Sequence, residues 1–395
     1  MFKSASSRLG RGPTIVKRWD LFCKVVDNYG DAGVCWRLAR QLAAEHALTV
    51  TLWIDELASL ARLAPGLAIA RDDQQVAGVR VRRLTDTPTD FLLPDAVIEG
   101  FGCGLPAHYL EAMAAAARAP VWINLEYLSA EPWVDSAHGL PSPQPRVPLT
   151  RHFYFPGFTA GTGGLLRERG LEAERDGAQA DRSARAAMLR SFGAGHADAQ
   201  ALVASLFCYP NLALPALLDA WAEGDAPVVC LVPDGVATAA LDAWTGGAVP
   251  HAGQALVHGP LTVAAIPFVE QDAYDRILWR CDVNFVRGED SFVRAQWAAR
   301  PFVWHIYPQA DDAHRVKLDE FLERFRSGLD ADDFLRLAAF WHAWNEGDGA
   351  ATATAWPAFR RTFPALRAHG GAWAKRLAAL PDLAGELVQF TRDRL

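Results

Sequence analysis

The chain has 395 residues, of which 51% are hydrophobic and 22% are charged. One hydrophobic core seldom organises more than about 250–300 residues, so this length predicts two domains, and the ordinary globular composition argues against extensive disorder. The formal net charge of −7 argues against a nucleic-acid-binding protein, because such proteins usually carry a basic surface.

The cysteines and the N-terminal segment indicate the compartment. Six cysteines occur without a C-x-x-C pair, which argues against a zinc site and against a disulfide framework. The basic N-terminal segment lacks the apolar stretch of a secretory signal, and no segment is long and apolar enough to span a membrane. We therefore expect a cytoplasmic protein without membrane contact, in which most cysteines are buried small hydrophobic residues.

The first half alternates predicted strands with predicted helices. Apolar runs predict strands at 19–26, 48–55, 95–102 and 119–127. Apolar residues at helical spacing follow the first run from Val34 to Leu42, and two further helices end near Pro65 and occupy AHYLEAMAAAARA. Strands that alternate with helices indicate a parallel sheet covered on both faces.

The middle of the chain interrupts this alternation. Residues 128–165 contain SAEPW, GLPSPQPRVP and FPGFTAGTGGLL. A loop this long in a compact domain is usually functional or disordered, and the aromatic residues of HFYFPGF favour an ordered loop. Residues 169–198 are rich in Ala, Asp, Arg and Gly and lack strand character, so they are expected to form a linker.

The alternation then begins again. Strands are predicted at 201–209, 227–233, 261–269, 282–286 and 301–307, and the chain is helical after about residue 312. Two doubly wound halves in series place the carboxyl ends of their strands across a shared cleft, where such sheets bind ligands. The pattern therefore predicts an α/β protein with a binding site between two Rossmann-like domains.

The sequence DNYGDAG, residues 27–33, joins the first predicted strand to its helix. A glycine-rich turn would hold a dinucleotide at this position, but only two glycines occur and two carboxylates would repel a pyrophosphate. Helix capping would account for Asp31 on its own, because Asp is common at helix starts. Two carboxylates at the end of one strand instead favour a general base that faces the cleft. Both interpretations stay open at this point.

The sequence RGEDSFVRAQ, residues 287–296, forms a second junction between a strand and a helix. Ser291 or Asp290 can cap this helix, and the free amides of its first turn would point at an anion in the cleft. Arg287 offers a guanidinium for a phosphate, and Glu289 suits the hydroxyl groups of a sugar. Capping alone would also account for Glu-Asp-Ser before an apolar helix.

Aromatic residues end several strands of the second half, namely Phe207, Tyr209, Phe268 and Tyr307. They are predicted to lie near one rim, where rings would sandwich a nucleobase and a phenol would reach a phosphate. Each of them taken singly would also fit in the core. Gln271 either caps the following helix or contacts the ligand.

Neither the histidines nor the carboxylates have the spacing of a metal site. The eleven histidines show no ligand spacing, and no D-x-D-like pair stands at a strand end in the second half. Such a pair would hold a divalent cation against a diphosphate. We therefore expect neither a metal ion nor another cofactor.

Several long motifs run in order from about residue 19 to residue 309. They are W-x-L-F-C-K-V-V-D-N-Y-G-D-A-G-V-C-W-R-L-A-R, N-L-E-Y-L-S-A-E, P-S-P-Q, G-G-L-L-R-E, I-P-F-V-x-Q, R-G-E-D-S-F-V-R-A-Q and P-F-V-W-H-I-Y-P-Q. Together they closely resemble the motifs of EarP, the family of arginine rhamnosyltransferases that modify elongation factor P. The N-terminal extension before Trp19 and residues 169–198 match no motif of that family.

The resemblance implies a GT-B glycosyltransferase that moves L-rhamnose from dTDP-β-L-rhamnose to an arginine of elongation factor P, with inversion. The implied domains are an acceptor-binding domain over 1–185, a nucleotide-sugar-binding domain over 186–365 and a helical segment over 366–395 that packs back on the first domain. Asp31 is implied as the catalytic base, with Asp27 and Asn28 in support. The implied donor-binding residues are Phe268 with Phe207 and Tyr209 for the thymine, Glu289 for sugar hydroxyls, and Arg287, Asp290, Ser291, Tyr307 and Gln271 for the diphosphate.

Three other functions fit parts of the sequence. A GT-B enzyme could act on a small molecule or lipid, although the first half lacks the apolar stripe expected for membrane docking. A nucleotide-sugar epimerase on this fold would need no protein acceptor. A non-catalytic module could bind elongation factor P without modifying it.

Overall fold

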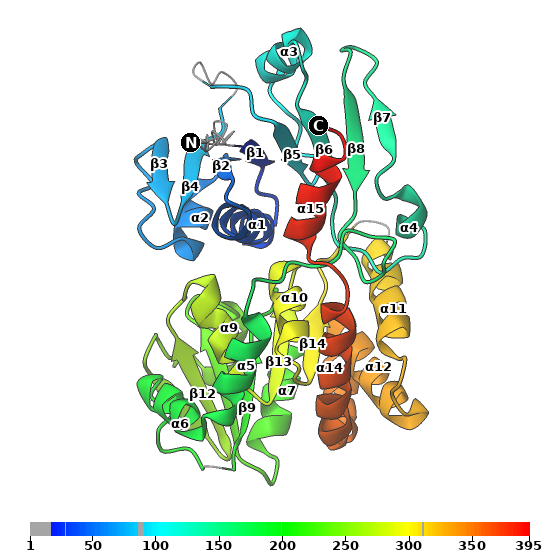
Figure 1. Cartoon of the computed structure of the whole chain (residues 1–395). Coiled ribbons are helices and arrows are strands. Elements are labelled where there is room, and N and C mark those ends of the chain that lie inside the picture. Colours follow the sequence, from blue (N-terminus) through cyan, green and yellow to red (C-terminus); the bar gives the residue numbers. More distant parts are fainter. Residues whose placement is uncertain (1–16, 28, 86–90, 199, 310–311) are drawn as a thin grey trace, which may run out of the picture.

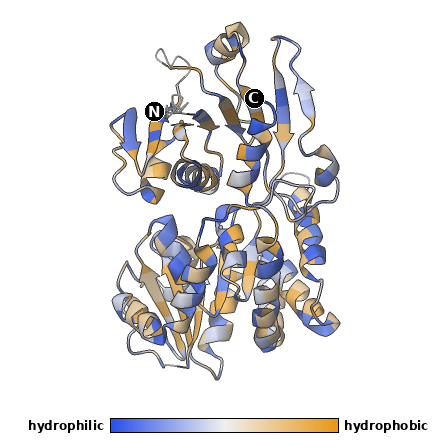
Figure 2. Cartoon of the chain, in the orientation of Figure 1, coloured by the Kyte–Doolittle hydropathy of each residue, from blue (hydrophilic) through white to orange (hydrophobic). Residues whose placement is uncertain are grey.

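The computed structural model describes residues 17–27, 29–85, 91–198, 200–309 and 312–395. The chain forms two lobes, each built around one sheet (Figure 1). The strands of the second lobe are largely hydrophobic (Figure 2), and a separate core of buried apolar side chains surrounds each sheet. The chain is therefore an α/β protein with the two parallel-sheet halves that the sequence predicts.

The first sheet is formed by eight strands. They are β1 (Arg18–Cys23), β2 (Thr49–Ile54), β3 (Asp73–Val76), β4 (Val79–Arg83), β5 (Ala96–Gly100), β6 (Val121–Leu125), β7 (Pro141–Pro143) and β8 (Thr150–Tyr154). Their order is β3-β4-β2-β1-β5-β6-β8-β7, and only the edge pairs β3–β4 and β7–β8 are antiparallel. The helices of this half are α1 (Gly30–His46), α2 (Leu57–Leu63), α3 (Ala107–Ala115) and α4 (Val134–Ala137). Every residue of β5 and β6 is buried, as expected for strands covered on both faces.

The second sheet is formed by six strands. They are β9 (Leu202–Leu206), β10 (Val228–Pro233), β11 (Ala255–His258), β12 (Leu261–Ile266), β13 (Val283–Arg287) and β14 (Phe302–His305). Their order is β11-β12-β10-β9-β13-β14, with only β11 antiparallel to its neighbour. The helices that follow these strands are α7 (Leu214–Ala222), α8 (Thr238–Thr245), α9 (Gln271–Arg280), α10 (Asp290–Trp297), α11 (Ala313–Phe325), α12 (Ala331–Glu346) and α13 (Gly349–Arg361).

Both sheets have a topological switch point that locates the site. In the first sheet the chain runs outward from β1 through β2 to β4 and then returns to β5 on the other side of β1. In the second sheet it runs from β9 through β10 to β12 and then returns to β13. Ligands of open α/β sheets bind beyond the carboxyl ends of the strands at such points. The sequences DNYGDAG and RGEDSFVRAQ follow β1 and β13 at these two points.

Four helices lie outside this alternation: α5 (Leu171–Ala180), α6 (Arg182–Ser191), α14 (Phe363–Ala378) and α15 (Leu383–Arg392). Helix α5 packs against α9 of the second lobe, and α14 contributes to the core of the second sheet. Helix α15 then crosses to the first lobe, where Leu383 and Leu387 join its core (Figure 1). The domain divisions expected near residues 185 and 365 stay predictions.

The two crossings between the lobes lie side by side. The backbone amide of Leu383 donates to the carbonyl of Leu165 at 3.0 Å. The Arg167 guanidinium donates to the carbonyl groups of Ala378 and Leu380. The segment that leaves the first lobe is therefore hydrogen-bonded to the segment that returns to it.

Two sequence predictions need correction. Residues 169–198, expected as a linker, form α5 and α6, and Asp181 caps α6 by accepting from the amide of Ala184. The predicted loop over 128–165 contains α4 and the β7–β8 hairpin. The hairpin of β3, the edge strand, and β4, its neighbour, was missed because both strands are short and rich in polar and charged residues, with Arg80 paired to Asp73 across the hairpin.

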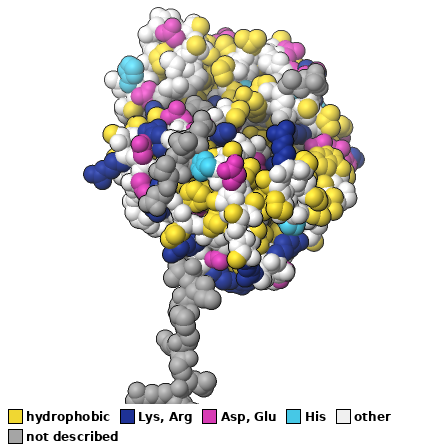
Figure 3. All heavy atoms as spheres, turned by 90° about the horizontal axis from the view of Figure 1, so that it is seen from above, with side chains coloured by type: hydrophobic (Ala, Val, Ile, Leu, Met, Phe, Trp, Pro, Cys, Tyr) yellow, Lys and Arg dark blue, Asp and Glu magenta, His cyan; other side chains and the backbone are white. Residues whose placement is uncertain are grey.

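The cysteines agree with the expectation from the sequence. Five of the six cysteines are buried and all six are free. Positive and negative side chains are interspersed on the face seen in Figure 3. Within the described ranges, every helix is too short or too polar to cross a lipid bilayer.

Candidate functional site

Two adjoining cavities open where the carboxyl ends of the two sheets meet. The first is lined by Asp27, Tyr29, Gly30, Leu63, Phe207, Pro233, Phe268, Val269, Gln271, Tyr274, Arg287, Asp290 and Ser291. The second is lined by Val26, Asp27, Gly30, Asp31, Phe101, Tyr127, Leu128, Gly288, Glu289, Trp304, Ile306, Tyr307, Gln309 and Lys317. Both cavities draw on both lobes, and they share Asp27 and Gly30. We call them the aromatic cavity and the carboxylate cavity.

Asp31 lies in the first turn of α1 and faces the carboxylate cavity. Its Oδ2 accepts hydrogen bonds from the backbone amides of Val26 at 2.8 Å and Asp27 at 2.9 Å. Its Oδ1 accepts a longer bond, of 3.3 Å, from the Tyr127 hydroxyl. Asp31 is therefore not the N-cap of α1, a position held by Tyr29. One oxygen orders the preceding loop, and the other is more weakly bound.

Asp27 connects the two lobes. Its Oδ2 accepts a hydrogen bond of 2.6 Å from the Tyr209 hydroxyl, which belongs to the second lobe. A β-carbon at Gly288 would lie 2.9 Å from that Asp27 oxygen and 3.1 Å from the Tyr209 hydroxyl, and Gly288 has a φ of +60°. Glycine meets both the steric and the backbone requirement at this position. Burial raises the pKa of Asp27, against the opposing effects of Tyr209 and Arg287.

Glu289 lies across the carboxylate cavity from the first lobe, immediately before α10. Its Oε2 accepts a hydrogen bond of 2.9 Å from the backbone amide of Leu128 in the first lobe. Burial, with the nearby negative charges of Asp31 and Asp290, raises the pKa of Glu289 to about 8. At neutral pH this carboxyl group therefore holds a proton and is able to donate a hydrogen bond.

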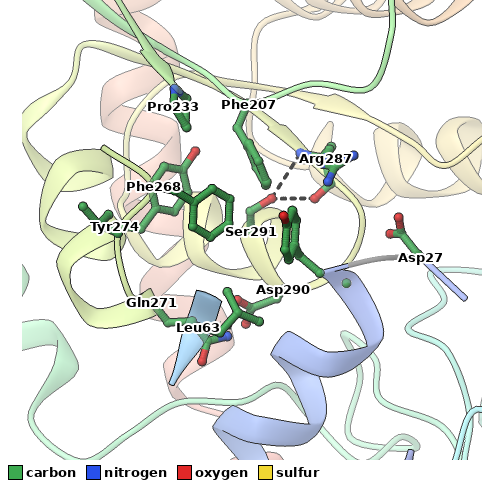
Figure 4. Close-up of a pocket in the computed structure, with 13 residues that line it drawn as sticks. Asp27, Leu63, Phe207, Pro233, Phe268, Gln271, Tyr274, Arg287, Asp290 and Ser291 are labelled. Carbon is green, nitrogen blue, oxygen red and sulfur yellow. Dashed lines mark hydrogen bonds between the residues drawn. The ribbon is translucent and has the colours of Figure 1, made fainter. Parts of the chain in front are cut away.

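Rings and one guanidinium enclose the aromatic cavity (Figure 4). Phe207 contacts Phe268 and Tyr274 edge-on, at centroid distances of 6.5 and 5.7 Å. The Arg287 guanidinium lies 4.7 Å from the Phe207 ring centre and 4.5 Å from that of Tyr209. A cavity lined by aromatic rings with a cation at one side suits a nucleobase that carries phosphates.

The first lobe closes this aromatic cavity from outside. Tyr29 packs against Phe268 with ring centres 4.7 Å apart. The Arg62 guanidinium lies 4.5 Å from the centre of the same Phe268 ring. The cavity is therefore built at an interface between lobes, and Phe268 is in contact with both.

Three predicted diphosphate residues are held by other protein groups. Asp290 accepts from Nε of Arg37 at 2.8 Å and from Nε2 of Gln271 at 2.8 Å. Gln271 also donates to the carbonyl of Gly33 at 2.9 Å. Ser291 accepts from the amide of Arg287 and donates to its carbonyl (Figure 4). Because Arg37 pairs with Asp290, a carboxylate is tolerated beside a cavity that would take an anion.

Of the remaining predicted residues, one lines a cavity, one lies buried behind the lining and one is outside the described residues. Tyr307 lines the carboxylate cavity and is 43% exposed. Tyr209 is buried, with its ring 5.4 Å from that of Tyr307, so it supports the wall between the cavities. Asn28, predicted to support the base, lies outside the described residues. No cluster of three or more potential metal ligands occurs among the residues that the structure describes.

Sequence reasoning missed several cavity residues. Phe101 and Tyr127 follow β5 and β6, and their rings stack at 4.4 Å with an interplanar angle of 15°. Phe101 has a φ of +55°, a strained conformation that is enriched at functional sites. Because both residues lie at the carboxyl end of a predicted strand, the sequence could have placed them at the cleft. Lys317 and Tyr274 lie within helices, and nothing in their sequence context marked them.

The chain is similar to members of one protein family in both sequence and structure. The profile of the family described as Elongation-Factor P (EF-P) rhamnosyltransferase EarP matches residues 19–392. A protein-arginine rhamnosyltransferase of Pseudomonas putida is 50% identical over 377 residues, covering 95% of this chain and 99% of that protein. Its counterpart in Pseudomonas aeruginosa is 47% identical over 377 residues with the same coverage. A solved structure described as the structural basis for EarP-mediated arginine glycosylation of translation elongation factor EF-P matches with a TM-score of 0.68 and 40% identity, covering 96% of this chain and 99% of that one.

The raised pKa of Glu289 predicts a pH-dependent cost to stability. Below pH 4.5, which is the ordinary pKa of a glutamate, the Glu289 carboxyl is protonated in both the folded and the unfolded state. In that range it contributes no pH dependence to the free energy of unfolding. As the pH rises toward 8, the unfolded chain loses this proton while the native protein keeps it, so the native state is progressively disfavoured. Glu289→Gln, which cannot ionise, should therefore raise the melting temperature relative to wild type more at pH 8 than at pH 5.

Differential scanning fluorimetry across that pH range measures the effect. Glu111→Gln, on an exposed position of α3, is the matched control and should show no such trend. A stability difference for Glu289→Gln that stays constant from pH 5 to pH 8 would contradict the raised pKa.

Proposed function

Since the chain belongs to the EarP family of elongation factor P rhamnosyltransferases, and is thus a protein-arginine rhamnosyltransferase with a GT-B fold, we propose that it transfers L-rhamnose from dTDP-β-L-rhamnose to an arginine of elongation factor P. The acceptor assignment is supported by the related solved structure, whose description concerns glycosylation of EF-P. Because a translation factor is the acceptor, the reaction takes place in the cytoplasm.

The observation that carries the proposal is the pair of cavities at the two switch points. One cavity has aromatic walls and a guanidinium, and the other has Asp31 from the first lobe opposite Glu289 from the second. They adjoin through Asp27 and Gly30. A nucleotide in the aromatic cavity would extend its diphosphate past Arg287 and its sugar toward the two carboxyl groups.

The acceptor chemistry requires a carboxylate at the position of Asp31. A guanidinium has a pKa above about 12 and is a poor nucleophile until a partner aligns it and takes a proton. Among the described residues, Oδ1 of Asp31 accepts only from the Tyr127 hydroxyl, at 3.3 Å. This oxygen would therefore accept an N–H of the substrate arginine. In the reaction that nitrogen forms a bond to C1 of the rhamnose, and its proton passes to Asp31.

The donor side must stabilise the leaving group. As the bond from C1 to the diphosphate oxygen breaks, its electron pair moves onto the diphosphate. Arg287 and the free amides at the start of α10 supply positive charge there. A single displacement with one base inverts the anomeric carbon, and Glu289, protonated near neutral pH, would donate a hydrogen bond to a sugar hydroxyl.

Asp31→Asn should abolish transfer while leaving nucleotide binding intact. The amide oxygen still accepts from the Val26 and Asp27 backbone, so the loop is kept, but the side chain no longer takes a proton. Mass spectrometry of elongation factor P after incubation with dTDP-rhamnose reports transfer, and calorimetry with thymidine diphosphate reports binding.

The matched control for that variant is Asp55→Asn. Asp55 also holds the loop, by accepting from the Val25 amide at 3.0 Å, but it lines neither cavity. Wild type and Asp55→Asn should both modify elongation factor P. Full activity of Asp31→Asn would exclude Asp31 as the base. Rhamnose found by mass spectrometry on a small molecule, with elongation factor P unmodified, would exclude the proposed acceptor.

Phe268→Ala should weaken thymidine diphosphate binding about tenfold or more, because stacking on an aromatic ring contributes roughly 1–3 kcal/mol per base. Isothermal titration calorimetry measures the change. Phe334→Ala is the control, since Phe334 is also a partly buried ring beneath an arginine, Arg326 at 5.2 Å, but lies on α12. Unchanged affinity of Phe268→Ala for thymidine diphosphate would show that the nucleobase does not bind in the aromatic cavity.

The proposed electrostatics also predict that transfer needs no divalent cation. Arg287 and the amides of α10 would offset the charge that a magnesium ion offsets in other nucleotide-sugar enzymes. Turnover measured with excess EDTA should therefore equal turnover without it. Loss of activity in EDTA that added Mg²⁺ restores would contradict this prediction.

A further inference from the structure

Arg37 is the most deeply buried charged side chain at the junction of the lobes, with 1% of its side chain exposed. It lies on α1, the helix that begins next to Asp31. Its Nε donates to Asp290 at 2.8 Å, and its Nη1 donates to Glu168 at 3.0 Å and to Asp275 at 3.2 Å. One guanidinium of the first lobe thus contacts α9, α10 and the segment that connects the lobes.

A second arginine completes this cluster. Arg294 of α10, 2% exposed, pairs with Asp275 at 2.7 Å and with Glu168 at 2.7 Å. Burial would raise the pKa of Glu168, but the guanidinium groups of Arg294 and Arg37 hold it well below its usual range. Burial raises the pKa of Asp275, against the opposing effects of Arg294 and Arg37. The cluster thus holds two guanidinium groups against carboxyl groups that bond to both of them.

Such a cluster is weak evidence for stability by itself. Removing two charges from water costs several kcal/mol per ion, and apolar side chains of the same volume often stabilise a protein as well or better. The best-attested use of buried ionic groups is to specify one arrangement of the elements that they join. The arrangement at issue here is that of α1 relative to α10.

That arrangement sets the distance across the carboxylate cavity. Asp31 lies in the first turn of α1, and Glu289 directly precedes Asp290, the residue that Arg37 holds. Gln271 reinforces the same contact by bridging Asp290 to the Gly33 carbonyl of α1. Arg37 itself lines neither cavity, so it would not touch a substrate.

We propose that Arg37 is a positioning residue, which fixes the α10 junction against α1 so that Asp31 and Glu289 face each other at the separation that transfer requires. This inference rests on the proposed function, because it gives Asp31 and Glu289 their roles. It also assigns a use to the W-R-L-A-R part of the first motif, which the chemistry of the cavities leaves unexplained.

The test uses a charge-balanced variant, because removing Arg37 alone would leave buried carboxylates without a partner. Arg37→Met combined with Asp275→Asn removes one positive and one negative charge, and Arg294 keeps its pair with Glu168. We expect kcat to fall roughly tenfold to a hundredfold, the scale expected for a misplacement of about 1 Å at reacting groups. Thymidine diphosphate affinity should fall by a smaller factor than kcat, because Arg37 lines neither cavity and its loss reaches the nucleotide only through the charge of Asp290.

Two single variants separate positioning from general interface stability. Arg40→Met removes a neighbouring ion pair between the lobes, since Arg40 contacts Asp272 at 2.8 and 2.9 Å, and it should leave kcat unchanged. Arg37→Lys keeps the charge but not the forked contacts, and should recover part of the lost kcat. All rates are measured well below each variant's melting temperature and per folded molecule.

Three results would overturn the inference: wild-type kcat in the charge-balanced variant, a loss of nucleotide affinity as large as the loss of kcat, or an equal loss of kcat in Arg40→Met. Wild-type protein in the same assay reports on the proposed function. If it transfers no rhamnose to elongation factor P, the proposed function fails and this inference fails with it. If wild type transfers and the variants behave alike, only the inference fails.

Discussion

A guanidinium buried where two sheets meet organises this molecule. Arg37 reaches from the first helix of one lobe to three carboxylates of the other lobe and of the connecting segment. The geometry leaves little freedom, because each partner also bonds to Arg294 or Gln271. The loops that follow β1 and β13 therefore meet in a defined register, and the two cavities are formed by that meeting.

The site has an unusual balance of charge as a result. Carboxyl groups from both lobes, Asp27, Asp31 and Glu289, face a region that also receives a diphosphate in the proposed reaction. Neighbouring groups moderate the negative charge: Asp27 accepts a hydrogen bond from Tyr209, and Glu289 keeps a proton near neutral pH. The adjacent carboxylate of Asp290 pairs with Arg37. The negative charge left at Asp31 then lies where a cationic substrate side chain would enter. A cationic acceptor and an anionic donor are thus served by neighbouring parts of one cleft.

The sequence predicted what local patterns encode. The buried strands, the two sheets and the residues at strand ends, such as Asp31, Phe207 and Arg287, followed from apolar runs and their junctions, because parallel strands bring their carboxyl ends to one edge. Contacts between distant segments could not be predicted in this way. The bond from Tyr209 to Asp27 joins residues 182 positions apart, and the partners of Arg37 lie up to 253 positions away. Whether Asp31 only caps α1 could be settled only by the positions of its carboxylate oxygens, which bond to the loop before the helix.

The return of α15 to the first lobe bears on how the enzyme could move. The outgoing and returning segments are hydrogen-bonded to each other at Leu165 and Leu383. They would therefore act as one hinge instead of two independent linkers. Rotation about such a hinge would displace the rim of the cleft most and the residues beside the crossing least. Opening of the cleft to admit a folded protein would then be a hinge rotation that separates the rings of Tyr29 and Phe268, which pack against each other across the two lobes.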